Sequence, residues 1–353
     1  MAETRPLLTF SIPTWNRAPF LAELLETLLP QFTGETRAEL LISDNHSTDE
    51  TEDVVQDFQA RGLPCRYVRN AENIGSDANF LQCFQLAAGK YVWVFGDDDL
   101  LMPNALAQLL SLLEQGEHSA EGDFDTVYLS GFGFRDVCKP STSTLQDALG
   151  RFAEVVTDGV YFLDKVNALI GLITANIVNK DRLLSVPHPP LEPLVGTNLM
   201  QTGWLFPVLH RRCRVLYLWQ RLYGYRSANS GGWGACEVFG IRLNAIAKNS
   251  FAAEPELSRA LMNGVTRYWM CDMVASLRSG GENETMLREN YDKLLRPVFG
   301  HNWRYWVFVY PLAVTPLFVM KPLHRALSLS NRLSRAVQAV YRSWFRSGQL
   351  LRP

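Results

Sequence analysis

The first 130 residues alternate short apolar segments with segments of helical periodicity, and this alternation constrains the fold more than any other feature of the chain. The predicted strands are 7–12 (stopped by Pro13), 39–43, 65–69, 91–95 and 126–129. The predicted helices are 18–32, a helix capped by Thr48 or Asp49, 76–88 (closed by Gly89), and a helix from Met102-Pro103 to about Leu113. Such an alternation predicts an α/β fold, with a mostly parallel sheet and helices on both of its faces.

The composition is typical of a globular protein. The chain has 353 residues, of which 47% are hydrophobic and 20% charged, so we expect a large core in one large domain with an appendage, or in two domains. The formal net charge of -2 argues against a general nucleic-acid binder. The six cysteines include no CxxC pair, which argues against zinc and disulfide frameworks and favours a reducing compartment. The N-terminus has no apolar run of signal-peptide length, so nothing there predicts export.

Charge is distributed unevenly along the chain. From Lys293 to Pro353 there are ten Lys/Arg and no Asp/Glu, which leaves 24 basic and 36 acidic residues in 1–292. An acidic body with a basic tail suggests that the tail meets an anionic surface. Within this tail, 303–320 is apolar and aromatic, but Arg304 and two prolines interrupt it, so it is borderline for a bilayer-spanning helix.

The segment 323–346 predicts a basic amphipathic helix. Its apolar face carries Leu327, Leu329, Leu333, Val337, Val340, Tyr341, Trp344 and Phe345, and its basic face carries Arg325, Arg332, Arg335, Arg342 and Arg346. Such a helix suits a membrane interface, where each basic residue adds about 1 kcal/mol near an anionic leaflet. The alternative is a helix packed on the protein's own core. We favour the membrane, because the segment has no acidic residue to pair with its arginines.

The sequence Gly96-Asp97-Asp98-Asp99 directly follows the apolar strand 91–95. Three adjacent carboxylates repel one another, and a divalent cation such as Mg²⁺ or Mn²⁺ is the natural compensation. In a doubly wound sheet the carboxyl end of a strand is also where ligands bind. The alternative is an acidic turn that caps the next helix, but one carboxylate is enough for that. We therefore predict a metal site that bridges these carboxylates to the phosphates of a nucleotide.

Polar residues also follow the other predicted strands. They are Thr14, Asn16 and Arg17 after the first strand, Asp44 and Asn45 after the second, and Asn73, Gly75, Asp77 and Asn79 after the third. Any one of them is more often a turn former than a ligand. Their shared position at carboxyl ends of strands favours a common site, in which an arginine suits a phosphate.

These motifs together resemble family 2 glycosyltransferases of the GT-A fold. The matching phrases are SIPTWNR (11–17), ISDNHSTD (42–49), NAENIG (70–75) and VWVFGDDD (92–99). The resemblance is specific over about 1–130 and weaker to about 250. The motifs Ile42-Ser43-Asp44-Asn45 and Gly96-Asp97-Asp98-Asp99 are similar to those of a bacterial subgroup that builds O-antigen and other surface polysaccharides, including abequosyltransferases. The resemblance implies transfer of a sugar from a nucleotide sugar, with Mn²⁺ or Mg²⁺ on the aspartate motif.

The resemblance also implies roles for individual residues. By its pattern, the nucleotide is bordered by Pro13, Thr14, Asn16 and Arg17, the base is contacted by Asp44, and the nucleotide and sugar pocket is lined by Asn73, Asp77 and Asn79. The family pattern Asp-x-Asp-Asp has Gly96 at its first position here. We therefore assign Asp97 to the ribose or sugar, and Asp98 and Asp99 to the metal.

An inverting member of the family needs a general base near the acceptor hydroxyl. The family's usual Glu-Asp pair is absent from the corresponding stretch 191–201, where Glu192 is the nearest carboxylate. His188 and His210 are the other candidates. The alternative for Glu192 is a solvated loop residue with no catalytic role. A Gly-rich segment follows Arg226, so 220–233 is either a mobile loop that closes over the diphosphate, with Arg226 as charge partner, or a strand and loop that serve only packing.

These expectations define a domain plan and a set of partners. We expect a GT-A catalytic domain at 1–235 (a nucleotide-sugar half at 1–130 and an acceptor half at 131–235), a helical region at 236–300 and a basic membrane-associating tail at 301–353. The partners are a nucleotide-sugar donor, a lipid-linked or oligosaccharide acceptor and anionic lipid of the inner leaflet, which places the protein in the cytoplasm at the cell membrane. A homo-oligomer through the C-terminal region is left open. The alternatives are a membrane-associated scaffold with a decayed transferase domain and a sugar nucleotidyltransferase, which the absence of a Gly-rich loop after the first strand disfavours.

Overall fold

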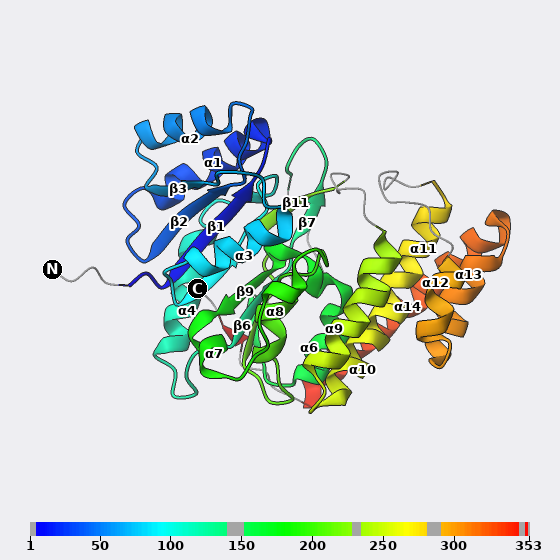
Figure 1. Cartoon of the computed structure of the whole chain (residues 1–353). Helices are drawn as coiled ribbons and strands as arrows, with labels where there is room; N and C mark the ends of the chain where they lie inside the picture. Colours follow the sequence, from blue (N-terminus) through cyan, green and yellow to red (C-terminus); the bar gives the residue numbers. More distant parts are fainter. Residues whose placement is uncertain (1–4, 140–151, 228–233, 281–290, 346–349, 352–353) are drawn as a thin grey trace.

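The computed structural model describes residues 5–139, 152–227, 234–280, 291–345 and 350–351 (Figure 1). A nine-stranded sheet in the order β12-β8-β10-β6-β9-β4-β1-β2-β3 forms its centre. Its strands are β1 Leu8–Thr14, β2 Ala38–Asp44, β3 Cys65–Arg69, β4 Tyr91–Val94, β6 Thr126–Leu129, β8 Ala153–Val156, β9 Asn176–Asn179, β10 Val215–Leu218 and β12 Leu350–Leu351. β8 and β9 run opposite to the others, so the prediction of a mostly parallel sheet is confirmed.

Helices cover both faces of this sheet, which is why β1 and β4 are buried along their whole length. The helices of this part are α1 Ala18–Phe32, α2 Thr51–Ala60, α3 Ser76–Leu86, α4 Ala105–Glu117, α6 Gly159–Val166, α7 Lys180–Ser185 and α8 Thr202–Leu205. A second sheet, in the order β5-β11-β7, joins Leu100–Leu101, Tyr223–Arg226 and Phe132–Phe134. It lies just beyond the acid turn, because β5 begins one residue after Asp99.

Among the boundaries that differ from the sequence predictions, four have an evident reason in the structure. β1 continues through Pro13 to Thr14. Proline has no backbone N–H to donate, but β4 pairs with β1 only as far as Ser11, so no bond to β4 is lost at Pro13. α3 ends at Leu86, and Gly89 does not cap it. A Cβ on Gly89 would lie 2.5 Å from the backbone nitrogen of Thr9, so glycine permits a close strand approach there.

The remaining two boundary differences lie at helix starts. α4 begins at Ala105 rather than at Met102, because Leu100–Leu101 pair as β5 and Asn104 takes a left-handed conformation with φ of 61°. α2 begins at Thr51, although Asp49 still accepts a hydrogen bond from the Thr51 amide at 3.2 Å.

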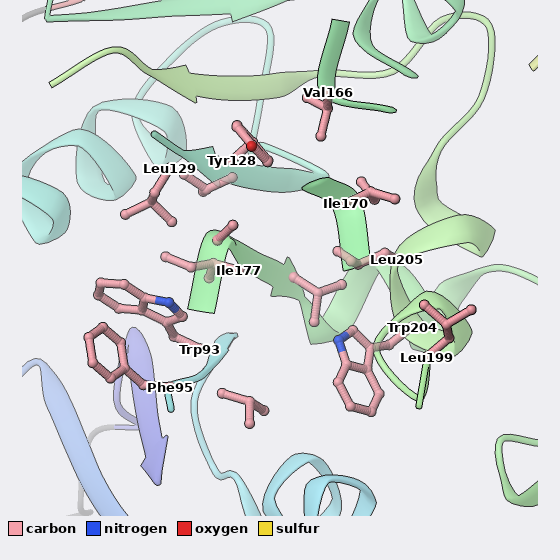
Figure 2. Close-up of a cluster of buried hydrophobic side chains, with 14 of the residues drawn as sticks. Trp93, Phe95, Tyr128, Leu129, Val166, Ile170, Ile177, Leu199, Trp204 and Leu205 are labelled. Carbon is pink, nitrogen blue, oxygen red and sulfur yellow. The ribbon is translucent and has the colours of Figure 1, made fainter. Parts of the chain in front are cut away.

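The core lies where the strands meet the segment 159–209. Figure 2 shows Trp93 and Phe95 beside each other, and their ring centroids are 5.1 Å apart in an edge-to-face arrangement. Farther along the same cluster, Trp204 lies near Leu199 and Leu205, and it stacks on Phe84 of α3 at 5.0 Å. This apolar packing fixes the end of β4 against residues that are distant in sequence.

The C-terminal part is helical where the structure describes it. Its helices are α9 Leu243–Ser250, α10 Pro255–Gly264, α11 Met270–Arg278, α12 Tyr291–Phe299, α13 Tyr310–Val314 and α14 Leu317–Phe345, with π-helical turns η5 Glu237–Arg242, η6 Val265–Trp269 and η7 Tyr305–Val309. The predicted helical C-terminal region is confirmed for the described residues. In Figure 1 this region, yellow to red, extends from the side of the sheet domain.

The apolar segment 303–320 is divided among η7, α13 and the start of α14, and the breaks coincide with its prolines. Among the described helices, none combines the length and the apolar character that crossing a bilayer requires.

Candidate active site

The acid turn, Gly96-Asp97-Asp98-Asp99, lies at the carboxyl end of β4 as predicted. The Phe95 amide donates to the carbonyl of Ser11 at 2.8 Å, and the Gly96 amide donates to Thr174 Oγ1 at 2.9 Å. Asp97 and Asp99 are buried. Burial, together with the charge of Asp98, raises the pKa of Asp97 to about 6 and that of Asp99 to about 7. The turn therefore places two buried acids with raised pKa values beside a third acid, Asp98.

Asp97 is held by the loop that follows β1. Thr14 Oγ1 donates to Asp97 Oδ2 at 2.8 Å, and Arg17 Nη1 lies 3.2 Å from Asp97 Oδ1. The same Arg17 nitrogen lies 3.1 Å from Asp98 Oδ2. Arg17, expected at a phosphate, is thus the cation that partly neutralises two of the three acids in this structure. Thr14, Arg17 and the aspartates are brought together as the sequence predicted.

Asp98 and Asp99 converge beside Gly96. A Cβ placed on Gly96 would lie 3.1 Å from Asp99 Oδ2 and 3.3 Å from Asp98 Oδ1, so an oxygen of each carboxylate faces the same point. Glycine leaves room for these oxygens at the position where the family pattern carries an aspartate. Two neighbouring carboxylates whose oxygens face one point match the oxygen ligands that Mg²⁺ and Mn²⁺ prefer, so the residues present fit a divalent ion.

A second cluster of ligand-type side chains lies elsewhere. Among the described residues, Cys271, Asp272 and His324 are the group of three whose potential ligand atoms all lie within 4.8 Å of one another. Burial, with the charge of Asp272, raises the pKa of the Cys271 thiol to about 12. The thiol is therefore protonated at neutral pH, and this group is a poor metal site.

Asp44 ends β2 and is completely buried. Its Oδ1 accepts from the Ser47 amide at 2.8 Å, and its Oδ2 accepts from the Tyr67 hydroxyl at 2.6 Å. Arg69 Nε lies 3.6 Å from the same oxygen. Both oxygens thus have protein partners, so Asp44 shapes the loop after β2, and its contact with a base stays a prediction.

The predicted asparagines join the loops after β1, β2 and β3. Asn16 Oδ1 accepts from the Thr48 amide at 2.7 Å, in a residue whose φ is 53°. Asn73 Oδ1 accepts from Asn45 Nδ2 at 2.8 Å. Asn79 is buried, accepts from Ser43 Oγ at 2.6 Å and donates to the Ser43 carbonyl at 3.0 Å. These bonds make one rigid rim at the edge where a ligand is expected.

Asp77, in the first turn of α3, binds a distant loop. Its Oδ2 accepts from the Asn198 amide at 2.9 Å, and the amides of Gly196 and Thr197 also stabilise its charge. Burial nevertheless raises the pKa of Asp77. Gly196 and Asn198 have positive φ values of 87° and 59°, so the loop is sharply turned around this carboxylate. Asp77 thereby connects the nucleotide half to the segment in which the base was expected.

Arg226 is the last residue of β11, and its side chain is committed to protein groups. Its amide donates to Asp99 Oδ1 at 3.0 Å, and its Nε donates to the Asp98 carbonyl at 3.1 Å. Nη2 pairs with Glu23 of α1, and Nη1 donates to the Arg135 carbonyl. The arginine thus supports the acid turn, while a contact with a diphosphate stays a prediction. The Gly-rich stretch 228–233 lies outside the described residues.

The structure separates the three candidate bases. Glu192 opens the short 3₁₀ helix η3 (Glu192–Leu194) and is exposed. His188 Nδ1 lies 3.0 Å from the carbonyl of Pro189. His210 Nδ1 lies 3.4 Å from Glu254 Oε2, and His210 is near Asp125, which precedes β6 at the end of the strands opposite to the acid turn. Within the described residues, no hydrogen bond or ion pair joins any of these three to the acid turn, and the identity of the base stays a prediction.

Three supporting residues were not singled out in the sequence. They are Thr174, which bonds the Gly96 amide and the Asp99 carboxylate, Tyr67, which bonds Asp44, and Glu23, which pairs with Arg226. Thr174 is 78 positions from Gly96, in the irregular segment after α6, and no local pattern marks it. Alternation in β3 could have predicted that Tyr67 lies on the same face of the sheet as Asp44. It could not have predicted the hydrogen bond from the Tyr67 hydroxyl.

Comparison with known proteins identifies the N-terminal part of the chain. Residues 9–142 match the family described as Glycosyl transferase family 2. This region is a family 2 glycosyltransferase domain. The resemblance predicted from the motifs is therefore confirmed, and the match includes all four strand-end clusters of the site.

Two curated relatives show the kind of protein in which this domain occurs. The region is 42% identical over 109 residues to abequosyltransferase RfbV of Salmonella typhimurium, which covers 31% of this chain and 33% of that protein. It is 30% identical over 112 residues to the GalNAc(5)-diNAcBac-PP-undecaprenol beta-1,3-glucosyltransferase of Campylobacter jejuni, which covers 31% of this chain and 36% of that protein. The chain thus spans about a third of the length of these relatives.

Solved structures extend the likeness to the whole fold. TarS 1-349 of S. aureus in complex with UDP-GlcNAc has a TM-score of 0.56 at 16% identity, over 93% of this chain and 92% of that one. At this identity the likeness establishes the fold alone. It confirms the predicted α/β fold with a helical C-terminal region.

Proposed function

We propose that the protein is a metal-dependent glycosyltransferase that moves a sugar from a nucleotide sugar to a saccharide acceptor in bacterial surface-polysaccharide synthesis. The observation that carries the proposal is the pair of carboxylates, Asp98 and Asp99, that converge at the end of β4 in a family 2 domain. The relatives named as transferases of abequose and glucose, and the UDP-GlcNAc complex of the TarS structure, support this class of donor.

We propose a separate role for each residue of the site. Asp98 and Asp99 would hold Mn²⁺ or Mg²⁺, which supplies Lewis-acid stabilisation of the departing nucleoside diphosphate. Thr14 and Arg17 hold the Asp97 carboxylate, and we propose that Asp97 contacts the ribose or the sugar. Arg17 Nη1 lies 3.1 Å from Asp98 Oδ2, and we propose that the Arg17 guanidinium would contact a phosphate oxygen of the bound nucleotide. A carboxylate on the acceptor side, with Glu192 as the candidate, would take the acceptor proton if the reaction inverts.

Nucleotide binding tests this assignment directly. Isothermal calorimetry with UDP, GDP, CDP and dTDP, each with Mn²⁺ or EDTA, should show base-selective binding that requires the metal. Asp98→Asn and Asp99→Asn should remove that metal requirement together with most of the affinity. Asp53→Asn is the matched control, because Asp53 is an exposed acid in the first turn of α2.

Three results would contradict the proposal. Metal-independent binding in the wild type, or unchanged binding in both variants, would remove the metal from the site. Binding without hydrolysis or transfer of any nucleotide sugar would favour the scaffold alternative.

We also propose that the protein attaches to the inner face of the membrane through α14 and acts on a lipid-linked acceptor. α14 presents exposed apolar side chains, with Phe318 79%, Leu329 59%, Leu333 59% and Val337 68% exposed. Its basic residues Lys321, Arg325 and Arg332 are exposed and form no ion pair with an acid in the described chain. An apolar strip beside unpaired basic charge suits an anionic lipid surface. The relative that acts on an undecaprenol-linked glycan agrees with such an acceptor.

A further inference from the structure

A crevice of about 410 Å³ lies between α14 and the helices that pack beneath it. Its walls come from α11 and the π-helical turn η6 on one side, from α14 on the other, and from the 3₁₀ helix η1 (Asn167–Gly171) at one end. Ser276 of α11 and Ser328 of α14 offer hydroxyls to it, and Arg332 and Arg335 line it from α14. The crevice is separate from the acid turn, and the proposed donor site uses none of its residues.

The floor of the crevice is rigid and its charge is positive. The buried Asn331 accepts from Arg267 Nε at 3.0 Å and donates to the Arg267 carbonyl at 3.0 Å, which locks α14 onto η6. Arg335 lies over the ring of Tyr268, 4.1 Å from its centroid, so its guanidinium is held in place.

The acid on the rim already has a partner. Asp272 Oδ1 lies 2.8 Å from His324 Nε2. In contrast, neither Arg332 nor Arg335 lies within ion-pair distance of a carboxylate in the part of the chain that the structure describes. Two guanidiniums without a counter-ion, beside two hydroxyls, match the oxygens of a phosphate or diphosphate.

The position of the crevice links it to both proposed surfaces. Arg332 lies between Leu329 and Leu333 in sequence, so the crevice opens along the basic edge of the exposed apolar strip. Leu169, at its other end, precedes Thr174 by five residues, and Thr174 bonds the acid turn. A stretch of five residues spans at most about 18 Å. An acceptor could therefore place its phosphate in the crevice, its lipid along α14 and its sugar toward the acid turn.

We propose that this crevice binds the diphosphate of a lipid-linked acceptor. The inference rests on the proposed function for the identity of the acceptor, but its test is a binding measurement that requires no transfer. Arg332 and Arg335 would clamp the diphosphate oxygens, with Ser276 and Ser328 as hydroxyl donors. The apolar strip would then receive the first part of the lipid.

Farnesyl diphosphate is a water-soluble probe for this site. It should be titrated into the full chain in EDTA, so that no metal can bridge its diphosphate to the acid turn. We expect saturable binding that Arg332→Gln weakens about tenfold or more, since hydrogen bonds to charged groups contribute strongly. Arg325→Gln removes an equal charge from an exposed position of α14 outside the crevice, and it should change the affinity less than twofold.

Matched ligands separate the sources of the phosphate. Inorganic pyrophosphate should bind at least tenfold more weakly than farnesyl diphosphate, and equal binding would overturn the lipid-linked assignment. Vesicles with phosphatidylglycerol should bind both arginine variants equally, because each variant removes one exposed basic charge of α14 and leaves the apolar strip unchanged. Equal losses of farnesyl diphosphate binding in Arg332→Gln and Arg325→Gln would overturn the assignment of the binding site to the crevice. If nucleotide binding fails while the arginine-dependent binding persists, the proposed donor function fails and the crevice stands.

Discussion

Thr174 supports the acid turn from outside the family motif. Its hydroxyl accepts from the Gly96 amide at 2.9 Å and stabilises the Asp99 carboxylate, and it is buried. Thr174→Val keeps the shape of the side chain and removes both bonds. We expect metal-dependent nucleotide affinity to fall about 10- to 100-fold, as for other residues that position metal ligands. Calorimetry with Mn²⁺ and the best nucleotide measures this loss.

Thr126→Val is the control for lost stability. Thr126 is also buried, and its hydroxyl donates to the Ile177 carbonyl at 2.6 Å at the opposite end of the sheet. Both variants should lose about 1–3 kcal/mol of unfolding free energy, because each leaves a buried polar group unpaired. Only Thr174→Val should change nucleotide binding. If the two variants bind alike, Thr174 has no role beyond stability.

Asp99 should make the stability of the metal-free protein depend on pH. Its pKa is about 7 in the folded state, because of burial and the charge of Asp98, and about 3.9 in an unfolded chain. Between these values the folded state binds more protons, so the free energy of unfolding falls as pH rises from about 4 to about 7. Asp99→Asn removes this titration. We expect the stability of the wild type to fall relative to the variant by on the order of 2 kcal/mol between pH 5 and pH 8.

Urea unfolding in EDTA measures this difference, since a bound metal would hold the carboxylate in its charged form. Asp97, whose pKa is raised to about 6, titrates in both proteins and largely cancels in the comparison. A pH-independent difference between the wild type and Asp99→Asn would show that Asp99 has an ordinary pKa.

Single residues of the site were predictable where they follow a strand within the same motif. Asp97, Thr14 and Arg17 meet because parallel strands β4 and β1 are neighbours, as they are in the usual strand order of a doubly wound sheet. Arg226 and Thr174 reach the same turn from segments that have no periodic pattern. Their partners depend on tertiary packing, which one sequence does not specify.

At the scale of elements, the loop 196–198 depends on α3. The Asn198 amide donates to Asp77 Oδ2, and Arg242 Nη1 donates to the Gly196 carbonyl at 3.0 Å from the other side. Asp77→Ala removes the anchor on the nucleotide side. We expect the Asn198 amide to exchange its hydrogen about tenfold faster or more, because it loses a hydrogen bond to a charged group. Hydrogen exchange followed by mass spectrometry measures this change.

Asp53→Ala serves as the control for that experiment, because Asp53 occupies the first turn of α2 and is exposed. It should leave exchange in 196–198 unchanged. Equal protection in Asp77→Ala and the wild type would mean that Arg242 alone holds the loop.

Elements with a clear period were predicted within a few residues, and the others were not. α1 and β3 have the predicted boundaries, because apolar spacing defines α1, and Pro64 and Asn70 bound the short strand β3. β9 was missed, since its four residues begin and end with asparagine, yet it inserts between β4 and β6. The proposed division at residues 235 and 300 stays a prediction.

At the scale of the whole molecule, α14 connects its two parts. Its buried side, which includes Met320 and Asn331, packs on the helical region, and β12, beyond it, pairs with β8 at the edge of the sheet. Its other side keeps the exposed apolar strip. The predicted amphipathic helix is therefore present. One side of it packs on the protein's own core, and another side exposes apolar residues. The side chains of Val340, Tyr341, Arg342, Trp344, Phe345 and Arg346 lie outside the described residues.

Membrane attachment through α14 should depend on that strip. Leu329→Ser, Leu333→Ser and Val337→Ser in one variant remove three exposed apolar side chains, so folding should be preserved while vesicle binding weakens. Partial insertion of these side chains is worth about 3 kcal/mol, so we expect about a hundredfold weaker partition onto vesicles with phosphatidylglycerol. Sedimentation with vesicles measures it, and the thermal unfolding temperature checks the fold.

Leu184→Ser and Val137→Ser form the control pair, because both side chains are 65% exposed but lie on the sheet domain. They should leave vesicle binding unchanged. Binding of the wild type should also weaken as salt is raised, since Lys321, Arg325 and Arg332 contribute through screened charge. Vesicle binding that survives the triple change, or that ignores both salt and lipid charge, would mean that α14 is not the attachment surface and that its apolar strip meets another protein.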